Sequence, residues 1–370
     1  MLRSAVCLLL IICFLWIDSE IGYSKEKWIH IPKEKAPDAR VLHTAIWDGH
    51  QMIIWGGVSD GGIDLNTGGR YDPSTDTWTS VTTEKAPDIR ENHTAIWDGH
   101  QMIIWGGIDD KTGVLNTGGR YDPSTDIWTP IATESVPEAR YVHTVIWTGT
   151  YMIVWGGSNI IDTFNDGGRY DPSTDIWTPI ATEESSETRS NHTAIWDGHQ
   201  MIIWGGTGRS DVLNTGGRYN PSTDTWLPVT TEGTPTPRVF HTAIWDGHQM
   251  IIWGGVGNGG VGLNTGGRYN PSTDTWLPVT TEGSPESRNG HTAIWDGHQM
   301  IIWGGVGNGG VGLNTGGRYN PSTDTWLPVT TEGSPESRNG HTAIWDDHQM
   351  IIWGGADNEG VSNTGSKFSE

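Results

Sequence analysis

Cysteine is almost absent from this chain of 370 residues, since only Cys7 and Cys13 are present and both lie near the N-terminus. In that region Arg3 precedes an apolar run over 5–17, which small or polar residues follow. This pattern is typical of a secretory signal peptide, and the run is too short to span a membrane. We predict a signal peptide over 1–24 and therefore a secreted, periplasmic or cell-surface protein.

Removal of this segment would leave no cysteine in residues 25–370. The mature protein is then expected to contain no disulfide and no thiol ligand, so that packing alone stabilises it. Lipidation of Cys13 is an alternative fate of the N-terminus. The bulky isoleucines before Cys13 disfavour it, because lipoprotein signals require small residues there.

Positive charge is also scarce, because 22 lysine and arginine residues face 44 aspartate and glutamate residues and the formal net charge is -22. Nucleic acid and anionic membrane surfaces are therefore excluded as partners. From Lys25 to Glu370 the chain has no linker, low-complexity run, block of like charge or long helical periodicity. We expect one domain, no integral membrane segment after signal cleavage, and a monomer.

What the chain does have is a repeat, the string HTAIWDGHQMIIWGG, in seven exact or near copies about 49 or 50 residues apart. A period of this length is typical of a solenoid or a propeller. Each copy period also contains three tryptophans. The copies start at His43, His93, His143, His192, His241, His291 and His341.

The copy that starts at His93 predicts four antiparallel strands. HTAIW and QMIIW are apolar runs joined by an Asp-Gly turn, which is typical of a β-hairpin. After Gly106 and Gly107 a variable loop leads to a third run, TGGRYD, which the turn PSTD connects to a fourth, IWTPI. Four such strands in 50 residues are typical of one propeller blade. The fold class expected is all-β, a seven-bladed propeller.

The run from Ile103 to Gly107, followed by Tyr121 and seven residues later by Trp128, resembles the kelch repeat. The resemblance recurs through residues 25–370 and implies a kelch β-propeller. It implies little about chemistry, because one fold supports many functions.

The two ends of the chain are expected to share the last blade. The seventh copy stops after its third strand, at Gly365 to Phe368. Trp28 stands 15 residues before His43, as Trp78 stands 15 residues before the next histidine of the repeat. The N-terminal strand therefore supplies the missing fourth strand, and we expect the sequence to be complete.

The two faces of the disc differ in how much the repeats vary. One face carries the nearly invariant WDGHQ and PSTD turns, and we call it the turn face. The other carries the loops between the second and third strands and between blades, which differ among copies, and we call it the loop face. Binding is expected on the loop face, because rigid scaffolds present function on their loops. The alternative explanation of this variation is sequence drift in loops that are under no functional constraint.

Three residues before each repeat histidine stands an arginine, and the set is expected to surround the channel mouth on the loop face. The residues are Arg40, Arg90, Arg140, Arg189, Arg238, Arg288 and Arg338. Such a ring could hold carboxylates or other anions, and the resemblance supports this, since peptide-binding kelch modules place arginines at this mouth. The alternative is a structural pairing with the glutamates six residues earlier, which are Glu34, Glu84, Glu134, Glu183, Glu232, Glu282 and Glu332.

The third and fifth copies place apolar residues in loops that should be exposed to solvent. We therefore expect a contact site beside Arg140 and Arg238. The predicted binding residues are Tyr141, Phe164 and Phe240, with Ile160 and Ile161 nearby. Their alternative role is to fold back and cover the ends of the blades.

Metal and catalytic sites are not expected. The repeat histidines should be buried or hydrogen-bonded in strands, and the turn-face histidines are not expected to form a site. The copper oxidases that the resemblance suggests need a cysteine, and Glu84, Asp88 and His93 miss the spacing of kelch iron sites by one residue. We therefore predict no catalytic residues and no cofactor. The sequence does not decide whether calcium binds in the acidic loops Ser59–Asp64 and Asp109–Leu115.

The fifth and sixth copies, 241–290 and 291–340, are identical. Such symmetry favours repetitive binding, because catalysis needs unlike groups placed asymmetrically. We predict an exported, non-enzymatic binding module for an unknown protein, peptide or glycan. The alternative is a secreted carbohydrate-active enzyme, epimerase-like or hydrolase-like, with its site at the arginine-ringed mouth.

Overall fold

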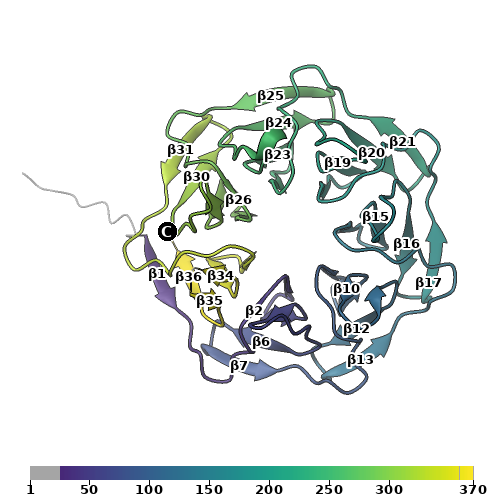
Figure 1. Ribbon diagram of the computed structural model, residues 1–370, viewed down its shortest axis with the longest axis vertical. Helices are drawn as coiled ribbons and strands as arrows, with labels where there is room; N and C mark the ends of the chain where they lie inside the picture. The colour runs from purple at the N-terminus through teal and green to yellow at the C-terminus, as the bar shows by residue number, and fades with distance from the viewer. Residues whose placement is uncertain (1–25, 358, 370) are drawn as a thin grey trace, which may run out of the picture.

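A computed structural model describes residues 26–357 and 359–369, so the predicted signal peptide lies outside the described residues. Seven four-stranded antiparallel sheets surround a central axis as the blades of a propeller (Figure 1). Blade 1 consists of β3 (Thr44–Trp47), β4 (Met52–Trp55), β6 (Gly68–Asp72) and β7 (Thr77–Ser80). The prediction of a seven-bladed all-β propeller with four strands per blade is confirmed.

The next five blades follow the same order from the axis outward. They are β8 (Thr94–Trp97), β9 (Met102–Trp105), β12 (Gly118–Asp122) and β13 (Ile127–Pro130); β14 (Thr144–Trp147), β15 (Met152–Trp155), β16 (Gly167–Asp171) and β17 (Ile176–Pro179); β18 (Thr193–Trp196), β19 (Met201–Trp204), β20 (Gly216–Asn220) and β21 (Thr225–Pro228); β22 (Thr242–Trp245), β23 (Met250–Trp253), β24 (Gly266–Asn270) and β25 (Thr275–Val279); and β27 (Thr292–Trp295), β28 (Met300–Trp303), β30 (Gly316–Asn320) and β31 (Thr325–Pro328).

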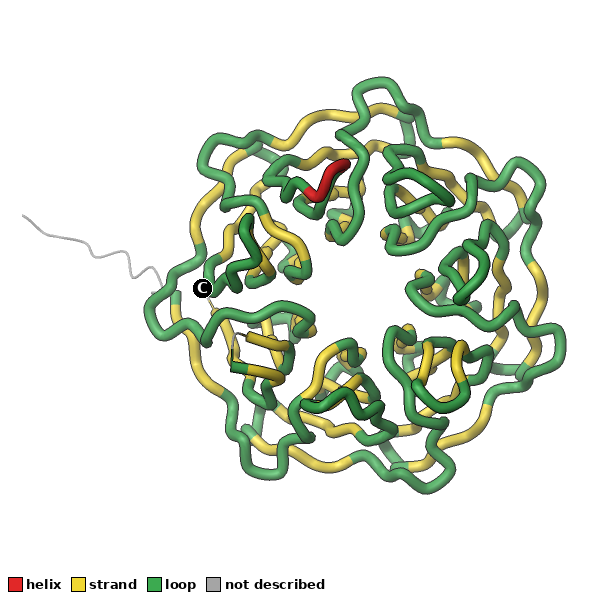
Figure 2. Tube along the Cα trace, viewed as in Figure 1, coloured by secondary structure: helices red, strands yellow, loops and turns green. Residues whose placement is uncertain are grey.

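The loop face adds short strand pairs near the channel mouth (Figure 2). They are β2 (Arg40–Val41) with β5 (Val58–Ser59), β10 (Ile108–Asp109) with β11 (Gly113–Val114), β26 (Arg288–Asn289) with β29 (Val306–Gly307), and β34 (Ala356–Asp357) with β35 (Gly360–Val361). One 3-10 helix, η1 (Asn258–Gly260), has three residues. Among the described residues, no helix is long and apolar enough to cross a membrane.

The core lies between neighbouring blades. Both faces of each blade are covered, so the second strands are apolar throughout, and all four residues of Met52–Trp55 are fully buried. Ile53 and Trp55 pack against Met102 of the next blade, and the ring centroids of Trp55 and Trp128 are 5.3 Å apart. Each junction repeats this tilted indole pair or a close variant of it, which is a favourable geometry for aromatic rings.

The Gly-Gly pair after each second strand is required by close packing. Gly56 has φ 68°, and a Cβ atom built there would lie 2.5 Å from Cε1 of His93. No other residue type can adopt this backbone and leave room for the histidine of the next blade.

Blade 7 is assembled from both ends of the chain, as predicted. Strands β32 (Thr342–Trp345), β33 (Met350–Trp353) and β36 (Gly365–Ser369) come from the C-terminal end, and β1 (Lys27–His30) pairs antiparallel with β36. In Figure 1 the purple and yellow ends of the chain lie side by side.

Glu26 makes this junction chemically similar to the others. It stands two residues before Trp28, as Asp126 stands two residues before Trp128. Asp126 Oδ1 accepts the backbone N–H of Thr82 at 3.1 Å, and Glu26 Oε2 accepts that of Thr330 at 3.0 Å. A carboxylate from the N-terminal segment therefore substitutes for the aspartate of the PSTD turn.

Candidate functional site

The seven repeat histidines form a closed ring of hydrogen bonds around the axis. Each imidazole is buried, and its Nε2 is 2.8 to 2.9 Å from Oγ1 of a threonine in the preceding blade. Burial, and to a smaller extent the positive charge of Arg40, lowers the pKa of His43 to about 3. The imidazoles are therefore neutral and structural, as the sequence predicts, and each is committed to a different threonine.

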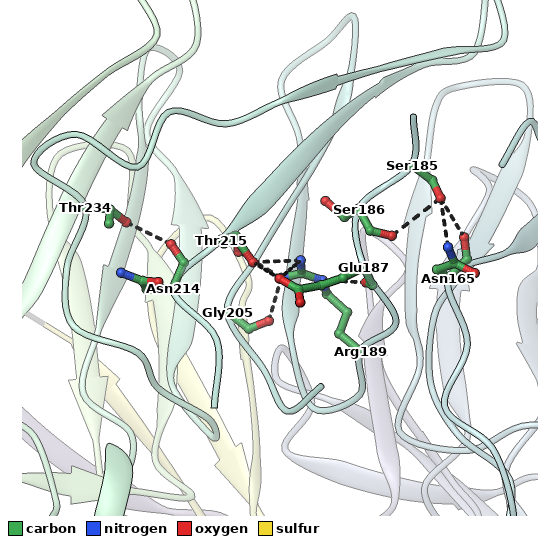
Figure 3. A network of polar contacts seen from close by, with 9 residues as sticks. All are labelled: Asn165, Ser185, Ser186, Glu187, Arg189, Gly205, Asn214, Thr215 and Thr234. Atoms are coloured by element: carbon green, nitrogen blue, oxygen red, sulfur yellow. Dashed lines mark hydrogen bonds and ion pairs between the residues drawn. The ribbon is translucent and has the colours of Figure 1, made fainter. Parts of the chain in front are cut away.

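The seven arginines lie next to this ring, but they are buried, with 0 to 2% of each residue exposed. Arg189 is representative (Figure 3): its Nη1 donates to the carbonyl oxygens of Gly205 at 2.9 Å and Thr215 at 2.8 Å, and its Nη2 donates to Thr215 Oγ1 at 3.1 Å. The guanidinium thus ties the loop that enters a blade to the second and third strands of the same blade.

This arrangement corrects the expectation that the arginines present free donors to a ligand. A buried guanidinium stays in place because backbone carbonyls satisfy it, and a ligand would have to displace those bonds. Burial lowers the pKa of Arg40 to about 10, with Asp38 acting in the opposite direction, so the group remains charged at neutral pH. The arginine ring is part of the framework beneath the channel mouth.

The predicted glutamate partners are also wrong in detail. Glu34, Glu84 and Glu134 are exposed, whereas the arginines that follow them are buried. The acidic group that acts on Arg40 stands two residues before it instead, at Asp38, and Arg140 pairs with Asp166 at 2.8 Å. The structural role of the arginines is correct, but backbone carbonyls are their main partners.

The channel mouth is formed by the residue before each repeat histidine, and we call this ring the collar. Its members are Leu42, Asn92, Val142, Asn191, Phe240, Gly290 and Gly340, and all have φ between 48° and 62°. Backbone hydrogen bonds link three pairs of neighbours in the ring, and in one of them the N–H of Asn92 donates to the carbonyl oxygen of Leu42 at 3.3 Å. Left-handed φ is rare for valine, leucine and phenylalanine, so the collar holds them under local strain.

The collar was missed by sequence reasoning, although a signal was present. Asn or Gly occupies this position in four of the seven copies, and those residue types tolerate left-handed backbone best. The three apolar members therefore stand where the fold itself favours small polar residues.

The predicted apolar contact site is only partly brought together. Phe164 is buried, and Cζ of Arg140 lies 4.3 Å from the centroid of its ring. Tyr141 is half-buried and forms a bridge with Ser158. Phe240 stays 52% exposed. The fold-back alternative therefore applies to Phe164, and Phe240 is the aromatic residue that faces solvent.

The turn face, where no site was expected, contains an open cavity of about 1080 Å³. Blades 7, 1 and 2 form it, and its lining includes Trp47, Trp97 and His50 with carboxylates from all three blades. Sequence reasoning missed it because the turns look alike in every copy.

Comparison with protein families decides the identity of the fold. A family model, the KLHDC2/KLHL20/DRC7 Kelch-repeats domain, matches residues 20–188, 142–285 and 263–368. The chain belongs to the kelch-repeat family. No curated protein was found to match this kelch propeller.

The acidic loops of the kelch propeller use their carboxylates internally. Asp109 Oδ1 accepts the backbone N–H groups of Lys111 and Thr112, both at 2.6 Å, and Asp64 Oδ2 accepts that of Asp110 at 2.8 Å. Within residues 26–357 and 359–369, no three histidine, cysteine or acidic side chains gather in a way that could hold a metal ion. In these loops Asp64 and Asp109 are therefore already engaged by backbone N–H groups.

Proposed function

We propose that this kelch propeller is an exported, non-enzymatic interaction module that binds a protein or peptide through its loop face. The observation that carries the proposal is where exposed apolar side chains occur. On the loop face they are Leu42, Ile63, Ile160, Ile161, Phe240, Val261 and Val311.

The remaining large apolar side chains that are exposed lie on the outermost strands, which form the rim. They are Ile29, Ile127, Ile176, Leu227, Leu277 and Leu327. None of the exposed large apolar residues in the described ranges belongs to a turn-face turn. Apolar groups collected on one face of a rigid scaffold support binding there.

The most exposed of these groups favour a partner with apolar side chains over a glycan. Ile160 is 76% exposed and Ile161 is 87% exposed in the loop of blade 3, and Phe240 projects from the collar two blades further on. Aromatic and aliphatic anchors of this kind contribute most of the energy in protein interfaces.

The carbohydrate-active enzyme was an alternative because such enzymes need only carboxylates, basic residues and a pocket, and its site was expected at the arginine-ringed mouth. Arg140 donates to backbone carbonyl oxygens, as its equivalents do, so these arginines are not free to bind a substrate anion at the mouth. The export part of the proposal rests on the N-terminal sequence pattern alone.

A peptide and glycan array screen of the mature chain, residues 25–370, would identify ligands. For a peptide ligand, Ile160→Thr with Ile161→Thr should weaken binding by ~1 to 3 kcal/mol. The matched control is Ile127→Thr with Ile176→Thr, because these rim isoleucines are also more than half exposed and other blades have threonine at the equivalent positions.

Each outcome bears on the proposal. Loss of binding in the loop variant alone supports the loop face. Equal loss in the rim variant, or turnover of a glycan by the unmodified chain, would overturn it.

A further inference from the structure

The turn face is less uniform in charge than its repeated sequence suggests. The residue before the PST turn is aspartate in blades 1 to 3, at Asp72, Asp122 and Asp171, and asparagine in blades 4 to 6, at Asn220, Asn270 and Asn320. In blade 7, Asp347 occupies the place that glycine has in the other six WDGHQ-type turns.

Three of these extra carboxylates meet at the turn-face cavity. Asp72, Asp122 and Asp347 all line it, and no lysine or arginine does. Burial opposes ionisation of Asp72, but hydrogen bonds from Ser74 outweigh it and hold the pKa of this carboxyl below its usual value. Hydrogen bonds from Ser124 lower the pKa of Asp122 in the same way, so Asp72 and Asp122 are ionised at neutral pH.

The cavity also has aromatic walls. Trp47 and Trp97 end the innermost strands of blades 1 and 2, and both side chains line the cavity while staying partly exposed. An indole face attracts a cation, and a carboxylate beside it adds a charge-assisted hydrogen bond.

We propose that this cavity, between blades 7, 1 and 2, binds an alkylammonium group of a polyamine or of a lysine side chain. A volume of about 1080 Å³ suits an organic ligand, since such pockets measure roughly 300–1,000 Å³. A bare metal ion fits less well, because its ligands must converge within ~2 to 2.6 Å and these carboxylates come from three separate blades. An anion would meet five carboxylates and no lysine or arginine.

The site lies on the opposite end of the blades from the loop face, because the WDGHQ turns join the first and second strands and the variable loops join the second and third. It is therefore independent of the proposed function. A propeller with both sites would hold two partners on its two faces.

The chain itself provides safe substitutions for a test. Ser222 N donates to Asn220 Oδ1 at 2.9 Å, and Ser74 N donates to Asp72 Oδ1 at 2.8 Å, so asparagine preserves the turn and removes the charge. Glycine at position 347 matches the six other turns and removes a left-handed φ of 75° from an aspartate. The triple variant D72N/D122N/D347G should fold normally.

The probes are spermidine, pentalysine and fully acetylated pentalysine, measured by calorimetric titration against the mature chain at physiological ionic strength. The triple variant should bind spermidine or pentalysine about tenfold more weakly, because three solvent-accessible charge pairs, each weak by itself, are lost together. The charge-matched control is D171N/E134Q/E232Q, whose three sites lie outside the cavity.

Preference for spermidine identifies a free polyamine as the source of the ammonium group, and preference for pentalysine identifies a lysine side chain. An affinity reduced equally by the control would show diffuse attraction to an acidic protein and overturn the proposal. Equal binding of the acetylated peptide, or binding of neither cation, would also overturn it.

Discussion

Replacement of Trp28 by alanine tests the closure of the ring most directly. The indole is 7% exposed, and its ring lies 5.3 Å from that of Trp303 and 5.0 Å from that of Phe368. Its Nε1 donates to Thr330 O at 2.9 Å across the junction. Truncation of a buried tryptophan costs ~3–5 kcal/mol in lost contacts and cavity formation, and the freed carbonyl adds to this.

We expect Trp28→Ala to lower the free energy of unfolding by that amount in urea titrations followed by far-ultraviolet circular dichroism. Aggregation on heating should also increase, because a loosened β1 exposes the edge of β36. Removal of residues 25–31 should have the same effects in stronger form.

The matched control is Ile29→Ala on the same strand. Ile29 is 41% exposed, so its truncation should change stability by less than about 0.5 kcal/mol. If Trp28→Ala costs no more than this control, the N-terminal strand does not close the propeller, and the reasoning from the tryptophan spacing is refuted.

Three further predictions concern the mouth and the histidine ring. Val142→Asn should stabilise the protein by ~1 kcal/mol in urea titrations, because a β-branched residue at φ 48° is strained; a loss of stability would contradict this. Arg90→Met should destabilise by roughly 2–4 kcal/mol, since buried carbonyls lose their donor, and unchanged stability would show that the arginine is not part of the framework. Burial, and to a smaller extent the charge of a nearby arginine, lowers the pKa of His43, His143 and His291 to about 3. The contribution of each neutral histidine to stability is therefore fully present above the unfolded pKa of 6.5. As the pH falls below 6.5, the free energy of unfolding should decrease by up to ~1.4 kcal/mol per pH unit for each histidine. A urea midpoint that stays constant from pH 8 to pH 5 would refute the last prediction.

The fold was predictable because its information is periodic and local. A repeat of about 50 residues with two hairpins predicts a blade, and the spacing from Trp28 to His43 predicts the closure. Both conclusions depend only on which residues recur at which interval, which the sequence displays directly.

The candidate site was less predictable because it depends on which group each side chain reaches across the blade. Arg40 Nη1 donates to the carbonyl oxygen of Thr67, 27 residues later, at 2.7 Å, and no local sequence pattern predicts that hydrogen bond. The regular glutamate six residues earlier suggested an ion pair, yet in the first copies this side chain extends into solvent. For the cavity, three single substitutions in distant turns become neighbours only when the ring is closed.

The carboxylate of Glu26 has a consequence for chain topology. It shows that a blade can be completed when its third and fourth strands are not covalently joined, provided that the incoming strand brings its own acceptor for the neighbouring backbone. Each PSTD turn is such a join, with Asp126 or an equivalent two residues before the tryptophan. Circular permutation, with the present termini linked and the chain opened within any one of these turns, should therefore yield the same ring from a differently ordered gene.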